Sequence, residues 1–228
     1  GVALSARAGF IGVAIVSALL PLLAFALVAG VPATTPFAGV RPPLREVLTR
    51  IAWPAVALAL QGIGFAAIGA FAVLYFQSRG WQGAGWLLTA FGVGFVLVRL
   101  TLARLPDRFG GARVAAVSML VESVGLALLA GADTPTAGLV GAALAGMGCS
   151  LVFPALGVVV VQRVQPQVRA TALGGYAAFQ DVAYALTGPL AGLVAAGLGY
   201  PAVFAMAACA AVTGAGVAMA LLFAARRG

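Results

Sequence analysis

Residues 51–76 read IAWPAVALALQGIGFAAIGAFAVLYF and contain no charged side chain. A helix needs about 20 mostly apolar residues to cross the hydrocarbon core of a bilayer. Further stretches of this kind lie at about 9–30, 82–104, 112–131, 136–162, 169–197 and 200–224. The sequence therefore predicts an all-α membrane protein with about seven transmembrane helices.

The composition supports a lipid-facing protein. Of the 228 residues, 63% are hydrophobic and 8% are charged, against about 25% charged residues in soluble domains. A bundle in lipid needs charge only at its two ends. The two cysteines, Cys149 and Cys209, fall inside apolar stretches, where we expect them to be small core residues.

Several function classes are disfavoured. The formal charge of +8 comes from arginines placed between apolar runs, whereas nucleic-acid binders gather bases and aromatics on a soluble face. All thirteen bases are arginine and there is no histidine, which excludes a lysine Schiff base and a histidine-ligated metal or haem. No nucleotide loop or catalytic triad is present. We therefore expect no enzyme activity, no cofactor, no metal and no nucleic-acid partner.

A proline-rich connection divides the chain unevenly. It separates a first part, 1–45, with one helix at about 9–30, from a second part, 46–228, with six helices. The six-helix part has the character of a complete unit.

Arginine placement predicts the orientation, because short cytoplasmic loops are enriched in Lys and Arg. Only Arg7 and Arg79 lie on one side. The other side carries Arg41, Arg45, Arg50, Arg99, Arg104, Arg108, Arg113, Arg163, Arg169, Arg226 and Arg227. We expect an external N-terminus and a cytoplasmic C-terminus.

The loop 103–113, ARLPDRFGGAR, resembles the cytoplasmic signature G-x-x-x-D-R-x-G-x-R-R of the major facilitator superfamily. It departs from the signature at Ala103, where the family has Gly, and at Gly111, where a base is common. The matching positions are Asp107, Arg108, Gly110 and Arg113.

The signature has a physical reading. An Asp in a tight turn can cap a helix N-terminus, and Gly110 permits the turn. The resemblance implies that Asp107 holds two helix ends together in one transport conformation, with its partner at the helix start near Arg169. The alternative is that these charges only set the topology.

A second motif lies in the sixth stretch. Residues 184–192, YALTGPLAG, are similar to the antiporter motif G-x-x-x-G-P-x-x-G of the same superfamily, with Tyr184 in place of the first Gly. Gly188, Pro189 and Gly192 would form a pliable packing seam on a gate helix. The alternative is ordinary helix packing without an antiport role.

Longer phrases, at 64–76, 105–115, 153–181 and 186–195, resemble the YfcJ/YhhS-type branch of bacterial facilitators, which implies efflux. This resemblance covers essentially all of the chain. It begins just after the fifth of the family's twelve helices, so the chain would correspond to helices six to twelve. The implied fold is half of a facilitator plus one extra helix, in a bacterial inner membrane, with the N-terminal half missing or supplied by a separate chain.

Ionisable groups inside a membrane are costly and suggest function. Glu122 and Asp181 both lie near the middle of their stretches, and Asp181, which we expect to be buried, is the first candidate for a proton carrier. Its alternative is a neutral packing residue. Arg99 is expected to reach Glu122, either as a structural ion pair or as a proton site switched by the arginine.

Polar groups near the same depth are candidates for a substrate cavity: Gln61, Gln180 and Tyr184. Together with the resemblance, they predict the C-terminal part of a secondary transporter that exports a small organic solute in exchange for protons by alternating access. Two alternatives stay open. The chain could be a half-transporter that pairs with a partner or with itself, or a membrane fragment without function.

Overall fold

The computed structural model describes residues 2–30 and 42–225. Arg41, Arg226 and Arg227 from the orientation argument lie outside the described residues. The chain divides into two units, Gly1–Ala38 and Gly39–Gly228. Seven helical segments in the described ranges are long and apolar enough to cross a membrane, and no strand occurs there. The prediction of an all-α membrane protein with seven spans is confirmed.

The described residues are almost entirely helical. In chain order they are α1 (Val2–Val28), α2 (Leu44–Ser78), α3 (Ala84–Leu102), α4 (Leu105–Phe109), α5 (Gly111–Ala130), α6 (Pro135–Cys149), α7 (Val152–Gln162), the short 3-10 helix η1 (Pro166–Val168), α8 (Arg169–Leu198) and α9 (Tyr200–Ala225). Within the first unit, α1 is kinked at Gly9, whose φ is 61°.

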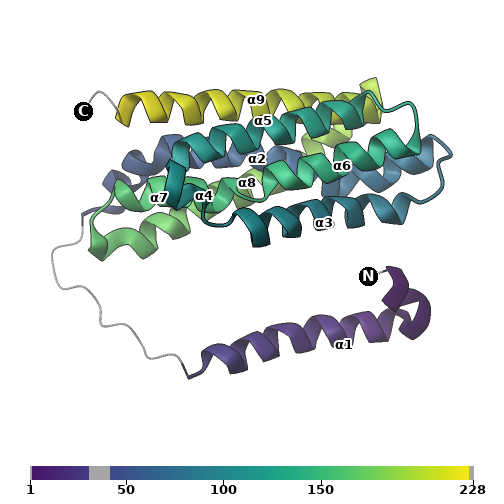
Figure 1. Ribbon diagram of the computed structural model, residues 1–228, viewed down its shortest axis with the longest axis horizontal. Helices are drawn as coiled ribbons and strands as arrows, with labels where there is room; N and C mark the ends of the chain where they lie inside the picture. The colour runs from purple at the N-terminus through teal and green to yellow at the C-terminus, as the bar shows by residue number, and fades with distance from the viewer. Residues whose placement is uncertain (1, 31–41, 226–228) are drawn as a thin grey trace. The chain divides into compact units, whose positions relative to one another are not determined.

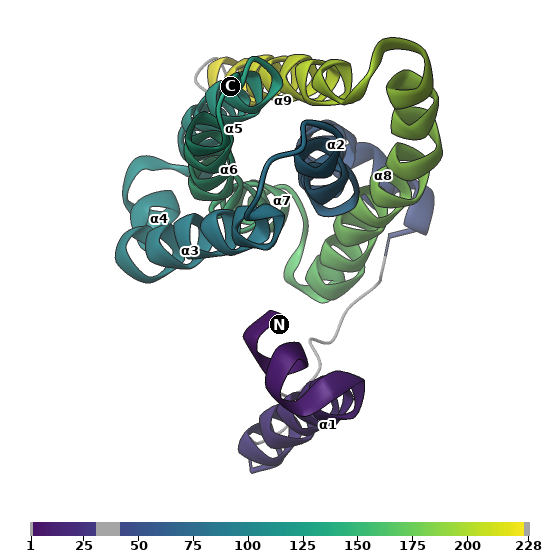
Figure 2. The same ribbon diagram turned by 90° about the vertical axis from the view of Figure 1, so that its right-hand side faces the viewer.

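In the second unit, α2 lies inside an arc formed by α8, α9, α5, α6 and α3 (Figure 2). The main packing pairs are α5 with α9 and with α6, α2 with α8 and with α9, and α3 with α6. Because α2 also touches α3, α5 and α7, residues near its middle can meet side chains from several helices.

Glycines allow the helices to approach backbone to backbone. A Cβ atom at Gly125 of α5 would lie 2.7 Å from the carbonyl oxygen of Gly141 in α6, and one at Gly148 would lie 2.6 Å from the Cα atom of Glu122. Small residues matter here because helix association in lipid depends on close van der Waals packing. The seam between α5 and α6 therefore constrains where Glu122 sits.

The expected span 136–162 is found as one membrane span, Pro135–Gln162, but its helix is interrupted inside the span. α6 ends at Cys149 and α7 begins at Val152. Pro154 has no N–H to donate to the carbonyl of Ser150, four residues earlier, and its ring crowds that carbonyl. The break therefore leaves the carbonyl oxygen of Ser150 free for another partner. The short helix α4 was also not expected.

Arginines gather at one end of the second unit, where α2, α5 and α8 begin and where α3, α7 and α9 end (Figure 1). The described arginines at that end are Arg45, Arg50, Arg104, Arg108, Arg113, Arg163 and Arg169. Which side of the membrane this end faces stays a prediction.

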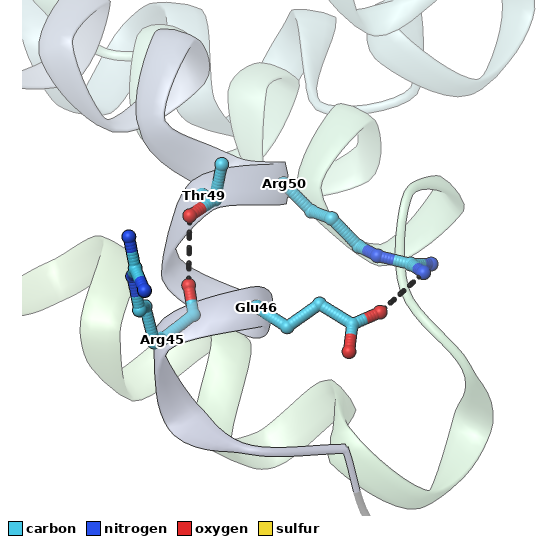
Figure 3. Close-up of polar contacts among 4 residues, drawn as sticks. All are labelled: Arg45, Glu46, Thr49 and Arg50. Carbon is cyan, nitrogen blue, oxygen red and sulfur yellow. Dashed lines mark hydrogen bonds and ion pairs between the residues drawn. The ribbon is translucent and has the colours of Figure 1, made fainter.

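Two hydrogen bonds join neighbouring turns at the start of α2. Arg50 donates to Glu46 one turn earlier at 2.6 Å, and the Thr49 hydroxyl donates to the Arg45 carbonyl at 2.8 Å (Figure 3). This is the one ion pair among the described residues. Both of its side chains are nearly half exposed, so we expect it to add little stability.

Candidate functional site

Four polar side chains meet in the middle of the second unit, and we call them the polar layer: Gln61, Glu122, Cys149 and Gln180. The Gln61 amide nitrogen donates to Glu122 Oε1 at 3.3 Å and to Cys149 Sγ at 2.7 Å. Gln180 in turn donates to Gln61 Oε1 at 3.4 Å. One glutamine of α2 thus connects α5, α6 and α8.

The polar layer separates two apolar clusters of the core. On α2, buried residues of one cluster end at Leu58 and those of the other begin at Ala67. On α5 the corresponding limits are Met119 and Leu126. Glu122 therefore lies between two apolar clusters of the core.

Glycines on α2 bring the neighbouring helices close enough to form the layer. A Cβ at Gly64 would lie 2.6 Å from Glu122 Oε1, and one at Gly62 would lie 3.2 Å from the Tyr184 ring and 3.5 Å from Gln180. A larger residue at Gly64 would occupy the space of the carboxyl group. The Gly-rich middle of α2 is thus shaped around the side chains of α5 and α8.

The carboxyl group of Glu122 is only partly satisfied. The residue is 1% exposed, and its Oε2 atom has no hydrogen-bond partner among the described residues. No cation stands beside it in the described part of the chain. An isolated charge in such a place costs several kcal/mol, so the group fits a site where a proton supplies the missing counter-charge.

The expected ion pair between Arg99 and Glu122 is not formed, and that prediction was wrong. Arg99 donates to the Ser150 carbonyl oxygen at 2.8 Å and lies 5.9 Å from the centre of the Phe95 ring. The prediction assumed that α3 lies beside the helix that follows it, whereas α3 packs against α6. Arg99 caps the carbonyl that Pro154 leaves free.

The hydrogen bond from Arg99 to the Ser150 carbonyl should contribute to stability. Replacing Arg99 with glutamine should lower the free energy of unfolding by about 1–3 kcal/mol, because a carbonyl at the helix break loses a charge-assisted hydrogen bond. Thermal unfolding in detergent micelles measures the change. Arg104→Gln, at an exposed arginine in the turn that follows α3, is the matched control, and an equal effect of both changes would contradict the capping role.

Asp181, expected to be buried, is exposed on the surface of this unit. It makes no hydrogen bond or ion pair with another described residue. α8 packs with one face against α2 and α9, and Asp181 lies on another face. The two acidic candidates therefore occupy different places: Glu122 inside the unit and Asp181 outside it.

The substrate-cavity candidates also differ from expectation. Gln61 is 1% exposed and holds the polar layer together, so the expectation that it faces a cavity was wrong for this structure. Gln180 and Tyr184 are partly buried. Tyr184 stacks on Phe65 of α2 with ring centres 5.4 Å apart.

Beyond Tyr184, aromatic rings continue along α2 and α3. Phe65 meets Phe91 edge to face at 5.7 Å, and Phe91 stacks on Phe95 at 6.3 Å. Phe65 is 38% exposed. The rings thus form a partly exposed row that leads from the polar layer to Arg99.

The signature loop has the turn that its glycine predicts. Gly110 has a φ of 88° between α4 and α5, a value that glycine adopts without strain. Asp107, Arg108 and Arg113 are exposed. Asp107 forms no ion pair with Arg169 within the described residues, so the helix-to-helix contact implied by the resemblance is not made in this conformation.

The expected packing seam on α8 is not used inside this unit. A Cβ at Gly188 or at Gly192 would meet nothing within 4 Å, and Pro189 is exposed. Helix α8 nevertheless continues through the proline. These small residues therefore present an open surface in this unit, and their role as a packing seam on a gate helix stays a prediction.

Both cysteines differ from what the sequence predicted. Cys149, expected to be a simple core residue, belongs to the polar layer, and Cys209 is exposed rather than buried. The run of small residues before Cys149 was the available signal, because it allows α6 to approach Glu122. No group of three or more metal-ligating side chains occurs in the described ranges.

Comparison with known proteins identifies this arrangement. The family model described as Major Facilitator Superfamily matches residues 82–228. The chain belongs to the major facilitator superfamily. An uncharacterized MFS-type transporter of Salmonella typhimurium is 48% identical over 222 residues, which are 97% of this chain and 57% of the relative. Another, of Pseudomonas aeruginosa, is 46% identical over 183 residues, which are 80% of this chain and 46% of the relative.

The chain spans about half the length of the curated relatives it matches. A crystal structure of the peptide transporter POT in complex with alafosfalin has the same fold over 79% of this chain and 42% of its own, with a TM-score of 0.66 and 17% identity. The chain is thus a multi-pass membrane protein with half of a facilitator fold plus one extra helix. Its family consists of transporters rather than enzymes.

Proposed function

We propose that this chain is the C-terminal part of a secondary transporter that exchanges protons for a small organic solute and exports that solute by alternating access. The observation that carries the proposal is the polar layer. It holds a buried carboxyl group with one unpartnered oxygen, and it ties that group to the helix that carries Asp181.

The two acids divide the proton path between them. Asp181, on the open surface of α8, is the group that exchanges protons with the transport path. Glu122 responds through Gln61 and Gln180, because a change in its charge alters the hydrogen bonds that hold α2 against α8. A bistable contact of this kind can link proton binding to helix movement.

The substrate would pass along the open side of α8, α2 and α3. Gln180, Tyr184 and the row of rings that begins at Phe65 offer hydrogen bonds and apolar surface there. Such a lining suits a small organic solute with an apolar body. The efflux direction rests on the resemblance to the YfcJ/YhhS-type branch, which stays a prediction.

Alternating access needs two sets of helices that move against each other. The partner surface would be the side of α8 where Gly188 and Gly192 are uncovered. In a second conformation Asp107 would meet the region of Arg169 and lock the helix ends. The other set of helices is the N-terminal half of the relatives, in the same chain or a separate one, or else a second copy of this chain.

The arginine-rich end supports a cytoplasmic C-terminus in a bacterial inner membrane. Seven described arginines stand at that end, where α3 and α7 finish. Cysteine labelling of Asp133→Cys and Asp107→Cys in intact cells tests the orientation. The first should react with a membrane-impermeant reagent and the second should not.

Expression in bacteria that lack their main drug pumps tests the transport function. The chain is expressed alone and together with the N-terminal part of the Salmonella relative, and cells are challenged with a panel of toxic organic solutes. Resistance that needs the second part and is lost in Asp181→Asn supports the proposal. The matched control is Asp133→Asn, an exposed acid in the turn before α6.

Three results separate the alternatives. Resistance from the chain alone would favour a self-associating half-transporter. No resistance to any solute in either form would favour a fragment without function. Resistance that is equal in Asp181→Asn and Asp133→Asn would leave transport intact and remove Asp181 from the proton path.

A further inference from the structure

A groove on the outer side of the second unit has no role in the proposed transport path. It lies between α3 and α5, with α6 as its floor and α4 at its end, and has a volume of about 380 Å³. In Figure 2, α4 lies on the opposite side of the unit from α8. The groove is therefore separate from the surface assigned to the substrate.

The groove is apolar along its length and charged at its rim. Its walls include Val98 and Leu102 of α3 and Val117 and Val121 of α5. Arg113 is the one ionisable side chain that lines it. An occupant must therefore combine an alkyl body with an anionic group at one end.

The dimensions match one leaflet of a bilayer. From Arg113 to Val121 the groove follows α5 for eight residues, about 12 Å at a rise of 1.5 Å per residue. Half of a hydrocarbon core of about 30 Å is about 15 Å. The groove thus runs from the charged end of the helices nearly to the middle of the membrane.

The charge at the rim is positive. The connection from α3 to α5 and the first turn of α5 together carry Arg104, Arg108 and Arg113 against the single acid Asp107, a net charge of +2. Basic pockets between membrane helices bind anionic lipid head groups. A zwitterionic lipid without net charge would gain less from this rim than an anionic one.

We propose that this groove binds an anionic glycerophospholipid, with one acyl chain between α3 and α5 and the phosphate held by Arg113. The site does not depend on the transport function, because it needs only that the helices span a membrane. Arg104 and Arg108 add long-range attraction for the head group, and the acyl chain provides the contact area that a free phosphate lacks.

Native mass spectrometry of the purified protein with phosphatidylglycerol and phosphatidylcholine tests the proposal. The wild-type chain should retain phosphatidylglycerol in preference to phosphatidylcholine. Arg113→Gln should weaken phosphatidylglycerol binding about fivefold, the effect of losing one base near a head group. Val117→Phe should weaken it by filling the groove.

Each variant has a matched control. Arg45→Gln removes an exposed arginine at the same end but outside the groove, and Val140→Phe enlarges an exposed residue of α6 that does not line it. Equal retention of the two lipids by the wild-type chain would overturn the proposal even if a variant fails to fold. So would displacement of phosphatidylglycerol by glycerol 1-phosphate, which would assign the site to a free phosphate, or an equal effect of Arg113→Gln and Arg45→Gln.

Discussion

Replacing Gly125 with leucine should disrupt the packing of α5 against α6 and should lower the stability of the protein by about 3 kcal/mol, the upper end of the usual cost of overpacking. A Cβ at this position would lie 2.7 Å from the Gly141 carbonyl oxygen and 2.8 Å from the Ala145 Cα atom. Both obstacles are backbone atoms, which cannot rotate away as a side chain can. Thermal unfolding in micelles, followed by circular dichroism, measures the loss.

Gly216→Leu in α9 is the control for this change, because a Cβ there would meet nothing within 4 Å. It should be neutral or stabilising by up to about 1 kcal/mol, since leucine favours helix more than glycine does. If Gly125→Leu were as stable as Gly216→Leu, the close seam that positions Glu122 would not exist in the membrane.

The second large effect concerns Glu122. Glu122→Gln keeps the shape of the side chain and an oxygen that can accept from Gln61, but it removes the ability to bind a proton. If Glu122 couples protons to transport, the variant should still move solute down its gradient but should no longer build one. The steady-state ratio of solute concentrations across the membrane should fall about 40-fold for each proton that is no longer exchanged at 100 mV. A charge that crosses this potential carries about 2.3 kcal/mol, and 1.4 kcal/mol is a factor of ten.

Steady-state solute ratios across energised vesicles measure this loss. Glu46→Gln, an exposed acid at the start of α2, is the matched control and should leave the ratio unchanged. A ratio that is the same in Glu122→Gln and in wild type would assign the polar layer to packing alone.

The number of spans and the class of fold could be predicted because bilayer thickness dictates the length and composition of each helix. The depth of Glu122 in the membrane could be predicted in the same way. It follows from the position of the residue near the middle of an apolar stretch, without knowledge of which helices pack together. The break between α6 and α7 was also within reach of the sequence. Pro154 marks it, because a proline removes the bond to the carbonyl of Ser150.

The partners of the polar groups could not be predicted, because they depend on which helices are neighbours. Arg99 was assigned to Glu122 on the assumption that consecutive helices pack side by side, but α3 packs against α6. The face that Asp181 presents depends likewise on the side of α8 that meets α2. Cys149 joined the polar layer only because Gly148 lets α6 approach the backbone of Glu122.

If this chain supplies the proton-coupled half of a transporter, then adding solute should move protons across the membrane. Inverted membrane vesicles with the chain and the N-terminal part of the Salmonella relative are acidified inside, and a pH-sensitive dye follows the gradient as a solute from the resistance panel is added. We expect the solute to collapse the gradient partly in wild type and Asp133→Asn vesicles but not in Asp181→Asn vesicles. Solute uptake without any change of the gradient in wild type vesicles would contradict proton coupling.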